Sequence, residues 1–127
     1  MGMYTEIYVN VDLSDDTPDE VVSLLQCMID GGHIDTTKYP RRWSMMFHGS
    51  SYLPNTWCGI LNRDSFLGGL SLLGKGAIKN YNDEIEKFFT FIAPFSETEF
   101  MGYMRYEEDE KPTLIYRSEA IQQQTKE

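Results

Sequence analysis

Residues 5–13 read "TEIYVNVDL" and alternate strictly between apolar and polar side chains. Successive side chains of an extended chain point to opposite sides. The apolar residues therefore share one face: Ile7, Val9, Val11 and Leu13. The other face carries polar side chains and Tyr8. This pattern predicts a half-buried strand, and other elements must cover its apolar face.

The segment that follows this strand carries the signals of a helix. Thr17 is a candidate N-cap, Pro18 suits the first helical position, and Glu20 completes a capping box with Thr17. The apolar residues of 21–29 recur at helical spacing, and Gly31 is a typical C-terminal stop. We therefore expect an amphipathic helix between Pro18 and Gly31.

A second helix is expected over residues 80–95, "NYNDEIEKFFTFIAPF". Asn80 or Asn82 can cap its start, and Tyr81 lies on the same side as the apolar residues that follow at helical spacing. Pro94 ends the helix, because proline cannot continue a helix interior. Together the two helices can cover one face of a sheet.

The remaining apolar segments are short and are predicted to be strands: 43–48, 56–62, 65–74, 99–107 and 113–117. The order is then β-α-β-β-β-α-β-β and contains a β-α-β-β pseudo-repeat, which duplication and convergence explain equally well. It predicts an α+β fold with a mostly antiparallel sheet of about six strands and two helices on one face. Residues 1–118 are expected to form a single domain, and 119–127 a polar C-terminal tail.

Residues 69–76, "GLSLLGKG", resemble a phosphate-binding Walker loop. Gly76 stands where such a loop needs a serine or threonine to hold magnesium, and the intervening leucines suit a core. We therefore interpret the segment as a strand that ends in a turn, with Gly74 and Gly76 allowing the chain to turn and Lys75 exposed to solvent.

The chain has 127 residues and a formal net charge of −9, from 20 acidic and 11 basic residues. Such a surface repels a phosphate backbone, so direct nucleic-acid binding is not expected and a basic protein partner is favoured. No apolar run is long enough to span a bilayer. Cys27 and Cys58 lack a metal-type spacing and favour a reducing, cytoplasmic compartment. The sequence indicates no metal, cofactor or catalytic residue.

Two groups of residues are candidates for protein binding. Tryptophan, tyrosine and arginine are enriched in binding hot spots, and one segment concentrates them: Arg41, Arg42, Trp43, Tyr52 and Trp57. A run of acids can contact a basic partner: Glu107, Glu108, Asp109 and Glu110, together with the acids of 15–20. Core packing of the tryptophans and a solvated acidic loop are the alternatives.

A cleft between two β-α-β-β halves is the alternative functional hypothesis. Such a cleft would bind a small ligand and would be lined by aromatic residues: Trp43, Trp57, Tyr103 and Tyr116. In addition, the uncovered face of the sheet suggests a homodimer, because some predicted strands are poor in polar residues. The residues that indicate this are Met45, Met46, Met101 and Tyr103.

Four segments together resemble a group of small uncharacterised proteins from bacteriophages and prophages: "MYTEIYVNVDL", "RRW", "NYNDEIEKFFTFIAPF" and "MGYMRYEEDEKPTLIY". The element order alone is also similar to that of gyrase-inhibitor-like ligand-binding domains, and a shared fold does not establish function. The phage resemblance implies the cytoplasm of a bacterial host and a small accessory protein that acts on host machinery or host defence. The expectation is a non-enzymatic protein that binds a host or phage protein.

Overall fold

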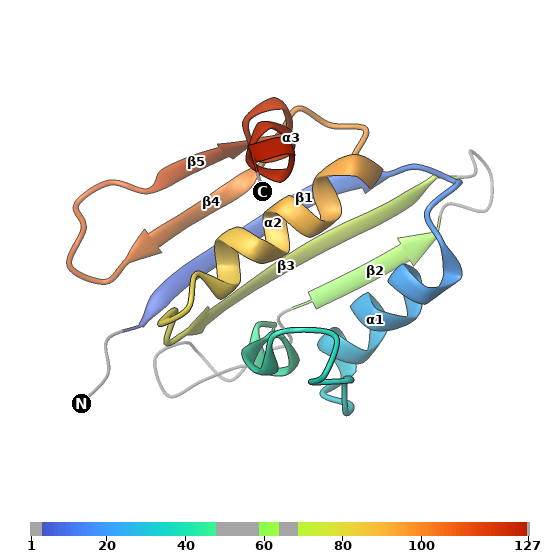
Figure 1. Ribbon diagram of the computed structural model, residues 1–127, viewed down its shortest axis with the longest axis horizontal. Helices are drawn as coiled ribbons and strands as arrows, with labels where there is room; N and C mark the ends of the chain where they lie inside the picture. Colours follow the sequence, from blue (N-terminus) through green and yellow to red (C-terminus); the bar gives the residue numbers. More distant parts are fainter. Residues whose placement is uncertain (1–3, 48–58, 64–68, 127) are drawn as a thin grey trace.

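A computed structural model describes residues 4–47, 59–63 and 69–126 (Figure 1). Its core element is one antiparallel five-stranded sheet with the order β2-β3-β1-β4-β5. The strands are β1 (Thr5–Leu13), β2 (Gly59–Arg63), β3 (Leu70–Ile78), β4 (Phe100–Tyr106) and β5 (Thr113–Tyr116). The helices are α1 (Asp19–Asp30), α2 (Glu84–Ile92) and α3 (Arg117–Lys126), with short 3-10 helices η1 (Arg41–Met45) and η2 (Ala93–Phe95).

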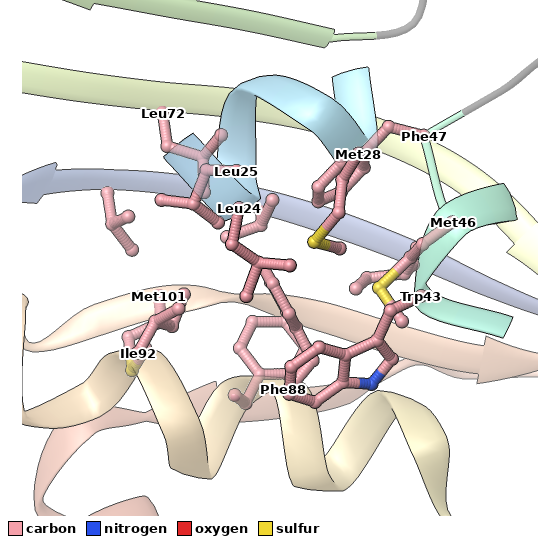
Figure 2. Packing of buried hydrophobic residues seen from close by; sticks show 14 of the residues in the cluster. Leu24, Leu25, Met28, Trp43, Met46, Phe47, Leu72, Phe88, Ile92 and Met101 are labelled. Carbon is pink, nitrogen blue, oxygen red and sulfur yellow. The ribbon is translucent and has the colours of Figure 1, made fainter. Parts of the chain in front are cut away.

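The helices that the structure describes all lie on one face of the sheet, and none of them lies on the other face, which we call bare in this sense (Figure 1). The alternation of β1 explains this arrangement, because its apolar side chains are all 1% exposed or less and lie beneath α1 and α2: Ile7, Val9, Val11 and Leu13. Figure 2 shows how side chains from α1, η1 and α2 meet in this core, where the Trp43 ring lies against the Phe88 ring. The expected α+β class, the antiparallel sheet and the covered face are therefore confirmed.

The expected strand at 43–48 is wrong. Residues 41–45 form η1, in which the Trp43 amide donates to the Pro40 carbonyl and the Met46 amide donates to the Trp43 carbonyl. The side chains of Trp43, Met46 and Phe47 are all buried, so the run is apolar without the alternation of a strand. The described sheet consequently has five strands in place of about six.

Gly74 and Gly76 lie inside β3, and the expected turn at this point is wrong. A Cβ atom on Gly76 would lie 1.7 Å from the Met46 carbonyl oxygen, and one on Gly74 would lie 2.7 Å from the Phe47 ring. These glycines therefore allow the chain after η1 to lie directly on the sheet. The leucine-rich segment is a strand, as expected, and its glycines serve close packing.

The β-α-β-β pseudo-repeat does not describe the sheet. Strand β3 pairs with β2 on one side and with β1 on the other, so it closes the first unit. The second unit, α2-β4-β5, has no leading strand of its own among the described residues. The predicted hairpin of β4 and β5 is confirmed.

Both expected helices are present, with different ends. The Thr17 hydroxyl donates to the Ser14 carbonyl and does not cap α1, which ends at Gly31 in the left-handed conformation as expected. Helix α2 begins only at Glu84, and the Asn80 side chain accepts a hydrogen bond from the Ile85 amide. Pro94 lies in η2, directly after α2.

The segment expected to be a polar tail forms a third helix, α3. Ala120 packs against the core, and the Arg117 amide donates to the Glu99 carbonyl. The Glu99 carboxylate accepts hydrogen bonds from both the amide and the hydroxyl of Ser118, at 3.2 and 2.6 Å. The start of this helix is thus held by a side chain from before β4, which local sequence patterns do not reveal.

Candidate functional site

Three tyrosines gather at one end of the sheet. The strand register places the start of β1 beside the ends of β3 and β4, because Thr5 pairs with both Ile78 and Tyr106. Tyr4 precedes β1 and Tyr81 follows β3, so both lie near Tyr106. We call this cluster the tyrosine-rich end, defined as Tyr4, Tyr81 and Tyr106 with the cations Arg42 and Lys79.

Two of these tyrosines carry cations against their rings. The Arg42 guanidinium lies 5.2 Å from the centroid of the Tyr81 ring, and the Lys79 ammonium lies 5.9 Å from that of Tyr4. Contacts of this kind favour the cation through the negative face of the ring. Tyr81 is still 61% exposed, so most of its surface is open to another molecule.

Arg42 is fixed in place by a buried acid. Its guanidinium and its backbone amide each donate to the Glu84 carboxylate, at 3.1 Å, and Glu84 is only 3% exposed. The neighbouring Trp43 indole donates to the Glu84 carbonyl at 2.8 Å. Because the pair is hydrogen-bonded and shielded, Arg42 has little freedom and presents a fixed cation to the Tyr81 ring.

The acidic turn between β4 and β5 borders the tyrosine-rich end. We call Glu107, Glu108, Asp109 and Glu110 the acidic hairpin. Glu107 accepts a hydrogen bond from the Tyr4 amide at 2.7 Å, and the Arg105 guanidinium donates to the Asp109 carbonyl at 2.7 Å. The other carboxylates are exposed to solvent.

The raised pKa of Tyr106 reflects its position near the acidic hairpin and near Tyr81. Desolvation raises it above the ordinary value of 10.0, and repulsion from Glu108, Glu107, Asp109 and the neighbouring Tyr81 raises it further. The phenol of Tyr106 thus lies within electrostatic reach of both the acidic hairpin and Tyr81. The structure therefore brings two groups that the sequence named separately, Arg42 and the acidic hairpin, to the same end of the sheet.

The other predicted interaction residues are distributed differently. Arg41 is exposed on η1, whereas Trp43 is 2% exposed and packs against Tyr39 and Phe88 at ring distances of 5.7 and 5.5 Å. Trp43 is thus a core residue. Tyr52 and Trp57 lie outside the described residues.

The acids of the first helix region do not join the acidic hairpin. Asp15 and Asp16 follow the end of β1, and the acidic hairpin lies beside its start. Nine residues of strand separate the two ends, or about 30 Å. The acids of 15–20 therefore form no common surface with 107–110.

The expected aromatic cleft is not assembled from its predicted residues. Trp43 lies in the core on the helix-covered side, while Tyr103 stacks on Tyr8 on the bare face, so the sheet separates Trp43 from Tyr103. Tyr116 contacts Phe100, with ring centroids 5.6 Å apart. Trp57 lies outside the described residues.

A different groove lies between α1 and α2. Its volume is about 850 Å³, and its lining includes Glu20, Tyr39, Trp43, Lys87 and Phe91. Lys38 and Tyr39 both contact the Glu20 carboxylate at its rim. The groove thus combines aromatic walls with charged groups of both signs.

Tyr81 and Tyr106 were missed as site residues by sequence reasoning. The helical pattern of 80–95 assigned Tyr81 to the apolar face, but α2 begins at Glu84 and leaves Tyr81 in the preceding loop. The signal that could have placed Tyr81 in a loop is residues 80–83, "NYND", because its two asparagines and its aspartate favour turns and helix caps.

Among the described residues, no group of three or more histidine, cysteine, aspartate or glutamate side chains is arranged to hold a metal ion. None of the helices described combines the length and apolar character that crossing a membrane requires. No protein-family model, no curated protein and no solved structure matches the chain.

Proposed function

We propose that this protein is a non-enzymatic binding protein that docks a basic region of another protein on its tyrosine-rich end and acidic hairpin. The resemblance to phage proteins extends the proposal to a host or phage protein as the target, with inhibition of host machinery or defence as the outcome. Partner recognition would then need no cofactor.

The observation that carries the proposal is the exposed ring of Tyr81 on the fixed Arg42. Tyrosine and arginine dominate binding hot spots because they offer large contact areas with polar tips. Binding is stronger when such groups are already ordered, since less side-chain entropy is lost. The Glu84 carboxylate holds the Arg42 guanidinium, and the Tyr81 ring lies against that fixed guanidinium.

The acidic hairpin supplies the second part of the proposed recognition. Its exposed carboxylates lie beside the tyrosines and give this end a negative charge that steers a basic partner toward them. Salt screens interactions between exposed charges over about 10 Å at 0.1 M. Partner binding should therefore weaken as the salt concentration rises.

The test compares two variants with the same net charge. In the first, the hairpin loses charge by Glu108→Gln, Asp109→Asn and Glu110→Gln. In the matched control, exposed acids at the opposite end of β1 are neutralised by Asp15→Asn, Asp16→Asn and Glu97→Gln. The tagged proteins are used to capture partners from a bacterial lysate at low and high salt.

A partner that the control variant and the native protein retain, and that the hairpin variant and Tyr81→Ala lose, is the expected result. Equal loss in both charge variants would show that only the overall charge matters. Failure to retain any specific partner at low salt would also contradict the proposal.

The groove between α1 and α2 supports a second candidate, a small-ligand-binding domain. Its volume of about 850 Å³ is in the range of small-molecule sites, and Tyr39, Trp43 and Phe91 provide apolar walls. Screening a metabolite library by NMR tests it directly. Shift changes centred on Thr90 and Phe91 would favour this candidate, and a library without hits there would count against it.

A further inference from the structure

The bare face of the sheet concentrates exposed apolar side chains. We call the side of the sheet without helices the open face (Figure 1). Of the seven large apolar or tyrosine side chains that are exposed among the described residues, four belong to it: Ile60, Leu73, Phe100 and Leu114, each 37–46% exposed. Two of the others, Tyr81 and Tyr106, belong to the tyrosine-rich end, and Met45 lies on η1.

Strand register places these residues on the same side. Ile60 pairs with Leu73, Leu73 pairs with Asn10, and residues directly opposite each other share a face. On the other side of β1, Tyr103 pairs with both Tyr8 and Leu114. One row thus runs from β2 to β1 and ends at Asn10, and a second runs from Lys75 of β3 through Tyr8 to β5. The two rows are neighbours on β1, because Tyr8 and Asn10 are two residues apart on the same face.

Phe100 joins the open face through a bulge in β4. The register shifts between Phe100 and Gly102, and Met101 is fully buried in the core beside Ile92 (Figure 2). Ile115 of β5 packs against the core, so its neighbour Tyr116 and the residue paired with Tyr116, Phe100, point away from the core. The methionines expected on this face, Met46 and Met101, lie on the covered side, and Tyr103 alone of that expected set is on the open face.

A rigid pair of tyrosines lies at the centre of the open face. The rings of Tyr8 and Tyr103 stack with centroids 5.3 Å apart and an angle of 19° between their planes. The Tyr103 hydroxyl donates to Glu6 at 2.9 Å, and the Asn10 amide donates to the Tyr8 hydroxyl at 3.2 Å. Both rings are therefore ordered before any partner arrives.

The charges of the open face balance, unlike those of the chain. The strand register places two acids, Glu6 and Asp12 of β1, and two bases, Arg105 of β4 and Lys75 of β3, on this face. These two acids and two bases sum to zero, whereas the chain carries −9. Two copies of this acidic chain repel each other over most of their surface, but two neutral open faces can meet without electrostatic repulsion. A basic partner, in contrast, would gain no electrostatic attraction at this face.

We propose that the open face binds the open face of a second copy of this chain, which gives a homodimer of two sheets packed face to face. The nine-residue strands β1 and β3 are about 30 Å long, and five strands span about 24 Å. Allowing for the shorter β2 and β5, each copy offers about 600 Å². The total of about 1,200 Å² reaches the lower limit of standard specific interfaces.

Sedimentation velocity of the full chain between 1 and about 200 μM tests the dimer. The expected species has a mass of about 29 kDa, twice the 14.7 kDa of the chain. Leu73→Lys places a charge on β3, beside the central strand β1 of the interface, and should give a monomer. Met45→Lys is the matched control, because Met45 is 50% exposed against 41% for Leu73 but lies on η1, and it should remain dimeric. Circular dichroism checks that both variants fold.

A native chain that stays at 14.7 kDa at the highest concentration would overturn the proposal. A Leu73→Lys variant that dimerises as well as Met45→Lys would overturn it too, since the contact would then lie elsewhere. The dimer should persist at high salt, in contrast to partner binding at the acidic hairpin. Leu73→Lys should also still capture the partner, so the two proposals fail independently.

Discussion

Gly76 in β3 lies directly beneath the carbonyl group of Met46. The space between them is so small that a Cβ atom at Gly76 would be 1.7 Å from the Met46 oxygen. This contact lets the end of η1 rest on the sheet and fixes the direction in which η1 enters the core. Since η1 carries Arg42, the glycine in the sheet helps to position the residue that holds Tyr81.

Gly76→Ala should strongly destabilise the protein. The added methyl group meets backbone, which cannot rotate away, so the loss in the free energy of unfolding should be at least about 3 kcal/mol, at the upper end of overpacking costs. Gly69→Ala is the control, because a Cβ there meets nothing within 4 Å, and its effect should stay within about 0.5 kcal/mol. Urea denaturation measures both, and equal stability of the two variants would contradict the packing described.

Arg42→Ala should cost about 3 kcal/mol of stability, because it leaves Glu84 buried without its cation. The adjacent Arg41→Ala removes the same charge from an exposed position and should cost less than about 0.5 kcal/mol. Thermal and urea unfolding measure the difference. Because Arg42 also orders Tyr81, Arg42→Ala should weaken partner capture even at temperatures where the variant remains folded.

Similar losses for the two arginine variants would show that the Arg42–Glu84 pair contributes little in solution. In that case Tyr81 would not be held by a fixed cation, and the tyrosine-rich end would lose the order on which the proposed binding depends.

The attachment of α3 should weaken in acid. The side-chain and backbone hydrogen bonds from Ser118 hold the pKa of Glu99 below its ordinary value of 4.5, and Arg117 adds a smaller attraction. A depressed pKa stabilises the folded state above the ordinary value, and this stabilisation is lost as the pH falls through the folded value. NMR titration of the Ser118 amide should therefore show a midpoint below 4.5.

Ser118→Ala provides the control for this titration. It removes the hydroxyl donor, so the pKa of Glu99 should move back toward 4.5. A native midpoint at or above 4.5 would show that the Glu99 carboxylate does not cap α3 in solution.

The features that sequence could predict are those encoded by neighbouring residues. The alternation of 5–13 predicts β1, Gly31 predicts the end of α1, and the acidic hairpin lies between two recognisable strands. Features that depend on distant contacts were missed. The run 43–47 resembles a strand in sequence, but the lack of a side chain at Gly76 lets it pack on the sheet instead. The start of α3 is capped by the Glu99 carboxylate, which is 19 residues away from Ser118 in sequence.

The candidate site follows the same division. The sequence could name Arg42 and the acidic hairpin by residue type, because hot spots favour arginine and steering needs charge. It could not show that they share one end of the sheet, since Arg42 and Glu107 are 65 positions apart in the chain. Tyr81 lies between them, against Arg42 on one side and near Tyr106 on the other. It is exposed because α2 begins only at Glu84 and leaves Tyr81 in the preceding loop.

The Tyr103 phenol on the open face should ionise at a higher pH than an ordinary tyrosine. Desolvation raises its pKa above 10.0, and the hydrogen bond and charge of Glu6 raise it further; Tyr8 adds to this, and Arg105 opposes it. A raised pKa means that the stabilisation is complete below pH 10 and is lost as the pH rises through the folded value. Glu6→Gln should lower the pKa of Tyr103 toward 10.0, as measured by NMR of carbon-13-labelled tyrosine.

Asp12→Asn is the control for that titration. Asp12 lies on the same face of β1 as Glu6 but bonds to Ser71, so its removal should leave the pKa of Tyr103 unchanged. Equal shifts in both variants would indicate that the overall charge, and not the Glu6 contact, controls Tyr103. Dimerisation through the open face desolvates Tyr103 further, so its pKa should also rise with protein concentration and should do so less in Leu73→Lys.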